Sequence, residues 1–430
     1  MSMNSRTTNW AGPASAPGWF TFRLLLRPLQ FGMAFPGALY AAALTIFLFR
    51  PPDLDLYHAD RIVLGALVFF VALRTMAMRE RLPFVAGISW PMLGLSTLAT
   101  IRALREPFDA QTWSLVASKF LVPLVLFHIA ILVFRGVSLP RHAEIFVIVV
   151  LGYLIFTAVA FLVDARSLIF PGYILDESLG IHADRARGPF LQAVANGLSL
   201  NLLGILAIVF AERHKKIVLL LWLALPFAML ATMTRAVWIA FAISTIALGF
   251  RLGIPCLRTA CLGLVLAGLA IVLAISITDN SLARTLRERT QERGPVEARM
   301  AVYDGAWDMF QERPFIGWTA GRMYSELARR MPGYHLRAFY VHNTYLALLV
   351  EFGIPGLALY GILFFNLFRL GRRTVSSNES PPLHTLRKAW PILLCVYLFN
   401  AFFVDMAYQF VIGIVFTVAG MLCASEEASL

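Results

Sequence analysis

The sequence predicts an all-α polytopic membrane protein, and three observations support this class. Hydrophobic residues make up 59% of the 430 residues, and the mean hydropathy is +0.72. Apolar runs close to the roughly 20 residues that cross a bilayer recur along the chain. Charged residues make up only 14% and cluster between those runs. A soluble protein of this length could not keep so much apolar surface from water, so we expect the chain to lie in a bilayer.

About twelve apolar segments are candidates for transmembrane helices. The first follows Arg23 and Arg27, and it is too long for a signal-peptide core, so we expect an uncleaved span. We predict helices 1–9 in residues 1–278, a large helical periplasmic loop in 279–342, and helices 10–12 in 343–430. The twelve segments lie at about 31–49, 62–78, 83–100, 113–134, 144–163, 190–210, 217–231, 236–252, 259–278, 354–370, 389–404 and 407–424.

Basic residues concentrate at the N-terminus and in alternate connections, which predicts that both termini are cytoplasmic. The loops at about 164–189, 232–235 and 279–342 then share the outer face of the membrane. The residues that give the net charge of +12 therefore lie in the loops. Basic loops of a membrane protein are more suited to binding anionic lipid than nucleic acid. The four cysteines have no zinc spacing and imply no disulfide. The basic residues of the N-terminus and of the predicted cytoplasmic connections include Arg6, Arg74, Arg79, Arg81, Arg135, Arg141, Arg213, Lys215, Lys216, Arg251, Arg258, Arg369, Arg372, Arg373, Arg387 and Lys388.

The large loop contains a predicted helix that lies on the bilayer surface. Pro295 suits the first turn of this helix, and Pro314 bars its continuation. Apolar side chains recur at spacings of three and four, which is typical of an amphipathic interfacial helix. This face comprises Val296, Met300, Tyr303, Trp307 and Phe310.

Arginine is abundant in the outer loops, and its planar guanidinium binds phosphate oxygens in bidentate fashion. Pairing with nearby acids along helical faces is the favoured explanation of the run from Arg284 to Arg293. Arg235 differs because it lies between two apolar runs, where an ionisable group is costly unless it has a partner, so we expect it to be functional. The outer arginines are Arg185, Arg187, Arg235, Arg284, Arg287, Arg289, Arg293, Arg299, Arg313, Arg322, Arg329, Arg330 and Arg337.

A histidine is the usual general base for a hydroxyl group near neutral pH. His58, His182, His335 and His342 fall on the predicted outer face. His342 is the strongest candidate because it joins the arginine-rich loop to an apolar run. An ordinary interfacial histidine remains the alternative.

A metal site is the competing interpretation of the first outer loop. Asp53 and Asp55 have the D-x-D pattern, and His58 and Asp60 are close by. Acids that merely flank helices are the simpler explanation of this pattern, so we predict no metal site here. The chain has no P-loop, no H-E-x-x-H and no G-x-S-x-G motif.

Four segments together resemble the O-antigen ligase and polymerase superfamily of bacterial envelope enzymes. Arg187-Gly-Pro-Phe-Leu-Gln-Ala-Val-Ala-Asn196 is similar to the family's R-G-x-F segment, and Met233-Thr-Arg235-Ala-Val-Trp238 to its S-R-x-x-W element, with Thr234 in place of serine. Arg299 through Pro314-Phe-Ile-Gly317 resembles its R…W…P-x-x-G pattern. His342-Asn-Thr-Tyr-Leu346, followed by Glu351-Phe-Gly-Ile-Pro-Gly356, resembles its H-N-x-x-L…E-x-G-x-x-G signature.

This resemblance implies a GT-C-like glycosyltransferase that needs no metal or other cofactor, at the periplasmic face of a Gram-negative inner membrane. Its donor is a glycan on undecaprenyl diphosphate, and the acceptor of a ligase is a sugar of lipid A–core. The resemblance implies that His342 is the catalytic base. It implies that Arg187, Arg235 and Arg299 bind the diphosphate, and we add Arg185, Arg337 and His335 as supporting candidates.

Other functions remain open from the sequence. The large loop near the C-terminal end favours a ligase over an O-antigen polymerase that uses the same donor, and a protein-glycosylating oligosaccharyltransferase is a third option. A flippase for the lipid-linked glycan belongs to another class and would show ionisable groups deep inside its spans. Lys119 is the main such group, and we expect its side chain to snorkel to the interface.

Overall fold

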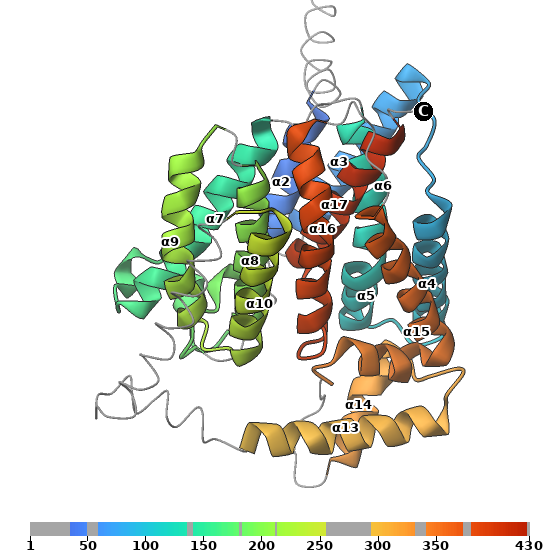
Figure 1. Ribbon diagram of the computed structural model, residues 1–430. Coiled ribbons are helices and arrows are strands. Elements are labelled where there is room, and N and C mark those ends of the chain that lie inside the picture. The colour runs from blue at the N-terminus through green and yellow to red at the C-terminus, as the bar shows by residue number, and fades with distance from the viewer. Residues whose placement is uncertain are drawn as a thin grey trace, which may run out of the picture.

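The computed structural model describes residues 35–49, 59–135, 141–179, 183–210, 213–254, 294–331, 341–372 and 380–427, and these ranges contain helices but no strand. Figure 1 shows most helices side by side in a bundle, with α13 lying across one end. The longer helices are α2 (Pro36–Leu48), α3 (Ala59–Met78), α4 (Ala86–Leu104), α5 (Ala110–Val116), the π-helical η1 (Ala117–Leu121), α6 (Val122–Phe134), α7 (Arg141–Leu162), α8 (Ala193–Phe210), α9 (Lys215–Ala231), α10 (Arg235–Arg251), α13 (Gly294–Glu312), α14 (Ala320–Arg330), α15 (Thr344–Leu370), α16 (Pro381–Asn400) and α17 (Gln409–Glu427). Short 3₁₀ turns lie at Arg166–Leu168, Gly172–Leu175 and Gly188–Phe190.

Each predicted apolar segment coincides with a helix, except 259–278, which lies outside the described residues. Among the described helices, 5 are long and apolar enough to cross a membrane, and Pro36–Leu48 and Gln409–Ser425 are shorter apolar helices. The chain is therefore a helical membrane protein, and the number of about twelve spans stays a prediction. The five are Ala59–Met78, Ala110–Phe134, Ala143–Leu162, Ala193–Phe210 and Thr344–Leu370.

Small residues allow the central helices to approach closely. A side chain at Gly420 of α17 would place its Cβ atom 2.6 Å from the Cβ atom of Ala130 on α6 and 2.8 Å from the carbonyl oxygen of Phe127. Such contacts are typical of helices packed in a bilayer, where no water is available to drive association. Helix α8 lies in the interior, since nearly all of its residues are buried.

Helix α15 is kinked at Gly353 and begins before the kink, whereas the predicted span began at residue 354. The structure begins this helix at Thr344, because the side chain of Asn343 caps it by accepting from the backbone N–H groups of Tyr345 at 3.0 Å and Leu346 at 3.1 Å. Gly353 has φ 68, which a residue with a side chain adopts only with strain. The interruption by Glu351 and Gly353 made the apolar run look shorter than the helix.

The connection between α13 and α14 packs against this kink, backbone against backbone. The Ile354 N–H donates to the Pro314 carbonyl at 2.8 Å, and the Trp318 N–H donates to the Val350 carbonyl at 2.6 Å. A Cβ atom on Gly353 would lie 2.4 Å from the Pro314 oxygen. This contact explains why a P-x-x-G segment and an E-x-G segment occur together in the chain.

The buried face of α13 is rotated from the one that the sequence predicted. Val302, Ala306 and Met309 are buried against α14 and α15, whereas Met300 and Trp307 are exposed. The prediction selected large apolar residues, but close packing of these helices selects the small Ala306 and the compact Val302. Of the other predicted residues, Tyr303 and Phe310 are half-buried, and the side chain of Val296 lies outside the described part of the structure.

Candidate functional site

Several connections that are distant in sequence lie at one end of the bundle. These are the α7–α8 connection, the α9–α10 connection and the helices α13 and α14 (Figure 1). The first two are joined by a hydrogen bond in which the Ala186 N–H donates to the Ala231 carbonyl at 3.0 Å. Arg235 and His342 therefore stand at the same end of the protein.

Some predicted residues lie outside the described parts of the chain. They include the supporting candidates His335 and Arg337, the histidines His58 and His182, and the acids Asp53 and Asp55. The arginines from Arg284 to Arg293 also lie outside. These residues stay predictions.

His342 occupies an unusual backbone position immediately before α15. Its φ is 50, in the left-handed region that non-glycine residues rarely adopt, and its side chain is half-buried. Backbone strain of this kind persists only where surrounding contacts impose it, and it is concentrated at functional sites. The Asn343 cap supplies one such contact, because it fixes the start of the helix directly after His342.

Thr344 ties this site to the connection between α16 and α17. Its hydroxyl donates to the Val404 carbonyl at 2.8 Å and accepts from the Met406 N–H at 3.0 Å. These two contacts flank Asp405 and hold it beside the start of α15. The His-Asn-Thr sequence thus places the histidine, caps the helix and secures a distant carboxylate.

A buried ionic cluster lies inside the bundle, beside the start of α15. The Lys119 Nζ atom is 2.7 Å from Asp405 Oδ2 and 3.0 Å from Glu351 Oε1. The Tyr324 hydroxyl, from α14, lies 3.1 Å from Asp405 Oδ2 and 3.3 Å from Glu351 Oε1. The cluster therefore joins η1, α14, α15 and the α16–α17 connection.

The expectation that Lys119 snorkels is wrong, because its ammonium group is buried and paired within the bundle. Lys119 lies in the π-helical segment, and such bulges are frequent at functional sites. In the sequence, Glu351 is notable only as part of the E-x-G-x-x-G motif, and Asp405 belongs to none of the four motifs. The available signal was three ionisable residues inside or beside apolar runs, where each needs a partner.

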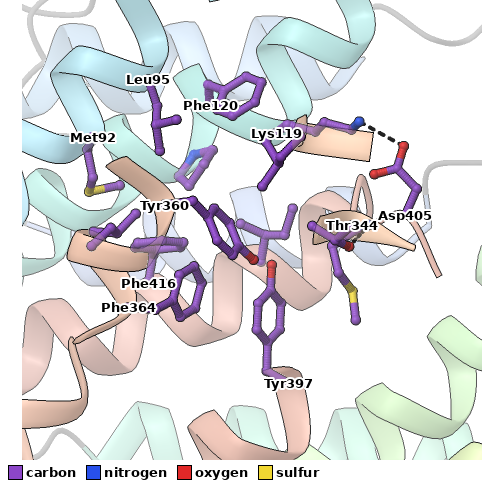
Figure 2. A pocket seen from close by; sticks show the side chains of 15 residues that line it. Met92, Leu95, Lys119, Phe120, Thr344, Tyr360, Phe364, Tyr397, Asp405 and Phe416 are labelled. Carbon is purple, nitrogen blue, oxygen red and sulfur yellow. Dashed lines mark hydrogen bonds and ion pairs between the residues drawn. The ribbon is translucent and has the colours of Figure 1, made fainter. Parts of the chain in front are cut away.

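A small cavity of about 30 Å³ adjoins the cluster, bounded by Lys119, Asp405 and Thr344 together with apolar and aromatic side chains. Figure 2 shows the hydroxyl groups of Tyr360 and Tyr397 facing one another, with the Lys119–Asp405 ion pair at one side. A cavity of this size has room for about two water molecules.

The surroundings of His342 favour a neutral imidazole. Burial lowers the pKa of His342 below its ordinary value of 6.5, and the positive charge of Arg299 lowers the pKa further. The carboxylate of Asp405 acts in the opposite direction and favours the protonated form. Burial and the charge of Arg299 thus outweigh Asp405 and leave the His342 imidazole in the neutral form, which can accept a proton.

Arg235 is the first residue of α10, and its side chain is exposed. The preceding turn is tight: Met233 has φ 49, and the Trp238 indole N–H donates to the Met229 carbonyl at 2.7 Å. A cation at a helix N-terminus is unfavourable for the helix itself, because the helix dipole is positive there. A guanidinium beside a helix N-terminus is an arrangement that attracts an anion.

Arg187 has a different environment from Arg235 and Arg299. It is 1% exposed, and its guanidinium donates to the backbone carbonyls of Ile174 at 2.9 Å, Leu179 at 2.5 Å and Asp176. All three nitrogen atoms are therefore directed at the loop between α7 and α8. This geometry shapes the loop and leaves no nitrogen directed outward.

The residues around Arg187 complete the same turn. Gly188 has φ 57, and a Cβ atom there would lie 2.5 Å from the Asn196 Oδ1 atom. The Asn196 amide donates to the Ala186 carbonyl at 2.8 Å. Arg185 lies 3.9 Å from Asp184 at the edge of this loop. The Arg-Gly-Pro-Phe segment thus acts as a structural turn that joins two helices.

Residues 218–361 match the family model described as O-antigen ligase, and no curated protein matches the chain. The matched segment runs from α9 into α15 and contains Arg235, Arg299 and His342. Lys119 and Asp405 lie outside the matched segment. The match confirms the superfamily that the four motifs suggested. The part of this chain that carries His342, Arg235 and Arg299 is thus similar to the O-antigen ligase family.

Proposed function

We propose that this protein is an O-antigen ligase that transfers glycan from undecaprenyl diphosphate to a sugar of lipid A–core. The reaction would take place at the periplasmic face of the inner membrane of a Gram-negative bacterium. The observation that carries the proposal is the position of His342, whose pKa is lowered, within the electrostatic reach of Arg299 and Asp405 at one end of a membrane bundle. The family domain supports the class of enzyme.

In the proposed reaction, a hydroxyl group of lipid A–core attacks the anomeric carbon of the donor sugar. The bond from this carbon to the diphosphate breaks, the new glycosidic bond forms, and the configuration inverts. His342 accepts the proton of the hydroxyl group, because a neutral imidazole is a competent base near neutral pH. Asp405 then stabilises the imidazolium.

The leaving diphosphate gains negative charge as its bond to the sugar breaks. We assign its stabilisation to Arg235 and Arg299, because fixed guanidinium groups bind this charge most strongly in the transition state. Arg187 becomes a positioning residue of the α7–α8 loop, since its three nitrogen atoms already donate to carbonyls. No step of this scheme calls for a metal ion.

The buried cluster also bears on the alternative of a flippase. Lys119 lies nine residues into Ala110–Phe134, and Glu351 seven residues into Thr344–Leu370, so the two lie roughly 10–14 Å along their helices. Both starting points are at the His342 end of the bundle. Ionisable groups inside the spans are a mark of a flippase, but the described cluster lies at a single depth, whereas a transport path would need polar groups at successive depths. This difference favours the ligase.

Transfer between defined lipids in detergent tests the proposal. Purified protein is mixed with glycan on undecaprenyl diphosphate and with lipid A–core, and the glycosylated lipid A–core is measured. A polymerase would instead lengthen the carrier-linked glycan without lipid A–core, and a flippase would form no product. Loss of transfer on adding EDTA would revive the metal site at Asp53 and Asp55.

Replacing Arg235 by alanine is expected to lower kcat/KM for the donor by about 100-fold, the usual cost of removing one donor to a developing anion. Arg235→Lys keeps the charge but not the bidentate geometry, so we expect it to recover only part of this loss. Arg251→Ala is the matched control, because Arg251 is exposed at the opposite end of the same helix. Unchanged donor kinetics in both Arg235 variants would remove this residue from the site.

The pH dependence of kcat/KM should report the environment of His342. Because the pKa of His342 is lowered, the imidazole stays neutral below pH 6.5, and activity is lost only as the pH falls through this lowered pKa. Arg299→Gln removes a positive charge, so the pKa of His342 rises and the loss of activity at low pH moves to higher pH. Asp405→Asn removes a negative charge, so the pKa of His342 falls and the loss of activity moves to lower pH. Shifts in the same direction in both variants would contradict the assignment.

A further inference from the structure

One face of α15 continues beyond the helix onto the connection between α13 and α14. Ile354, Ala358, Ile362 and Phe365 are exposed and recur at spacings of four, four and three, so they form one stripe. Thr344–Leu370 is long and apolar enough to cross a membrane. An exposed apolar stripe on such a helix faces acyl chains.

Phe315 and Ile316 extend this stripe at the His342 end. Their side chains are 69% and 64% exposed, similar to Phe365 at 63%. Their position is fixed, because the Pro314 carbonyl accepts from the Ile354 N–H at 2.8 Å, and a Cβ atom on Gly353 would lie 2.8 Å from the Phe315 carbonyl carbon. Figure 1 shows the α13–α14 connection at the edge of the bundle beside α15.

The residues around this turn are those found where a membrane protein meets the lipid headgroups. The Arg313 guanidinium stacks over the Trp318 ring at 4.0 Å, and the Trp318 indole donates to the Met309 carbonyl at 2.9 Å. Tryptophan and arginine are typical of this boundary. A neighbouring connection adds Phe108, which is exposed.

The α4–α5 connection that carries Phe108 is tied to the same place. Glu106 lies 2.9 Å from the Arg322 guanidinium and accepts from the Thr319 hydroxyl at 3.4 Å. Both residues belong to the segment that follows the turn. Two connections with exposed aromatic residues therefore meet at this edge.

We propose that the turn at Phe315 and Ile316 inserts into the leaflet at the His342 end, where lipid acyl chains cover both side chains. Acyl chains are the expected occupant because the turn is continuous with the lipid-facing stripe of α15. The turn ends α13 and contacts the α15 kink, so its insertion sets the depth of both helices. Arg299 on α13 and His342 before α15 are thereby held at the level of the lipid headgroups.

Photocrosslinking in lipid nanodiscs tests this insertion without measuring activity. p-Benzoylphenylalanine replaces Phe315, Ile316, Phe365 or Arg329 one at a time, and adducts with phospholipid acyl chains are quantified by mass spectrometry. Phe365 is the lipid-facing control, and Arg329, whose side chain is 77% exposed and paired with Glu326, is the polar control on α14. We expect adducts at Phe315 and Ile316 as abundant as at Phe365, and none at Arg329.

Absence of adducts at Phe315 and Ile316, with adducts at Phe365 retained, would overturn the insertion and leave the proposed chemistry untouched. Adducts at neither the turn nor Phe365 would overturn both the insertion and the lipid-facing stripe. A second measurement uses Phe315→Trp with brominated acyl chains. Quenching of the added fluorescence, relative to the parent protein, is expected, and an unquenched signal would also exclude insertion.

Discussion

The His342→Ala variant is expected to lose glycan transfer by on the order of 10²- to 10⁴-fold, because it lacks the base that accepts the acceptor proton. Donor binding should remain, since Arg235 and Arg299 are unchanged. In cells, glycan linked to its lipid carrier should accumulate. The measurement is the rate of lipid A–core glycosylation at saturating donor, with donor binding measured separately.

Two further variants make this result specific. His342→Asn removes the base but tolerates the left-handed backbone at φ 50, so it should fold normally and be equally inactive. His384→Ala removes a histidine near the start of α16, at the opposite end of the bundle, and should transfer at the normal rate. Normal transfer by His342→Ala would leave the proposed mechanism without its base.

Replacing Lys119 by methionine is expected to have the largest effect on stability. The substitution keeps an unbranched side chain of nearly the same length but leaves Glu351 and Asp405 buried with no cation between them. Removing one partner of a buried ion pair costs about 3–5 kcal/mol of unfolding free energy. Thermal unfolding in detergent, followed by intrinsic fluorescence, should show a lower midpoint.

Neutralising the two carboxyl groups in the same protein tests the cause. Lys119→Met combined with Glu351→Gln and Asp405→Asn should recover part of the lost stability, because no uncompensated charge remains. Lys216→Met is the control, since Lys216 is exposed at the start of α9 and should leave the unfolding midpoint unchanged. A Lys119→Met protein as stable as the parent would show that the cluster does not stabilise the bundle.

Local sequence features predicted the helices well but their packing faces poorly. Runs of apolar residues located α7 and α8 nearly to their ends, because length and hydropathy are properties of a contiguous segment. The face of α13 was wrong because burial there depends on the small Ala306 fitting against α14. Residue size in one helix cannot be interpreted without knowing its neighbour.

Some predicted site residues have the surroundings that their roles require in the structure, and others do not. His342 was found from its place at the mouth of an apolar run, and the structure puts Arg299 within electrostatic reach of it. Arg187 was selected for its charge, but the structure buries it among carbonyls of its own loop. A guanidinium that binds a phosphate and one that holds a loop look identical in the sequence.

The sequence by itself determined that this chain is a helical membrane protein and pointed to the O-antigen ligase family as similar, because hydropathy and ordered short motifs are properties of contiguous sequence. Only the tertiary structure decided which charges meet. Lys119 and Glu351 are 232 residues apart in the chain, and the contacts of Thr344 with the α16–α17 connection help to hold Asp405 beside them. The physical reason is that a buried charge requires a partner, but the identity of that partner is set by how the helices pack.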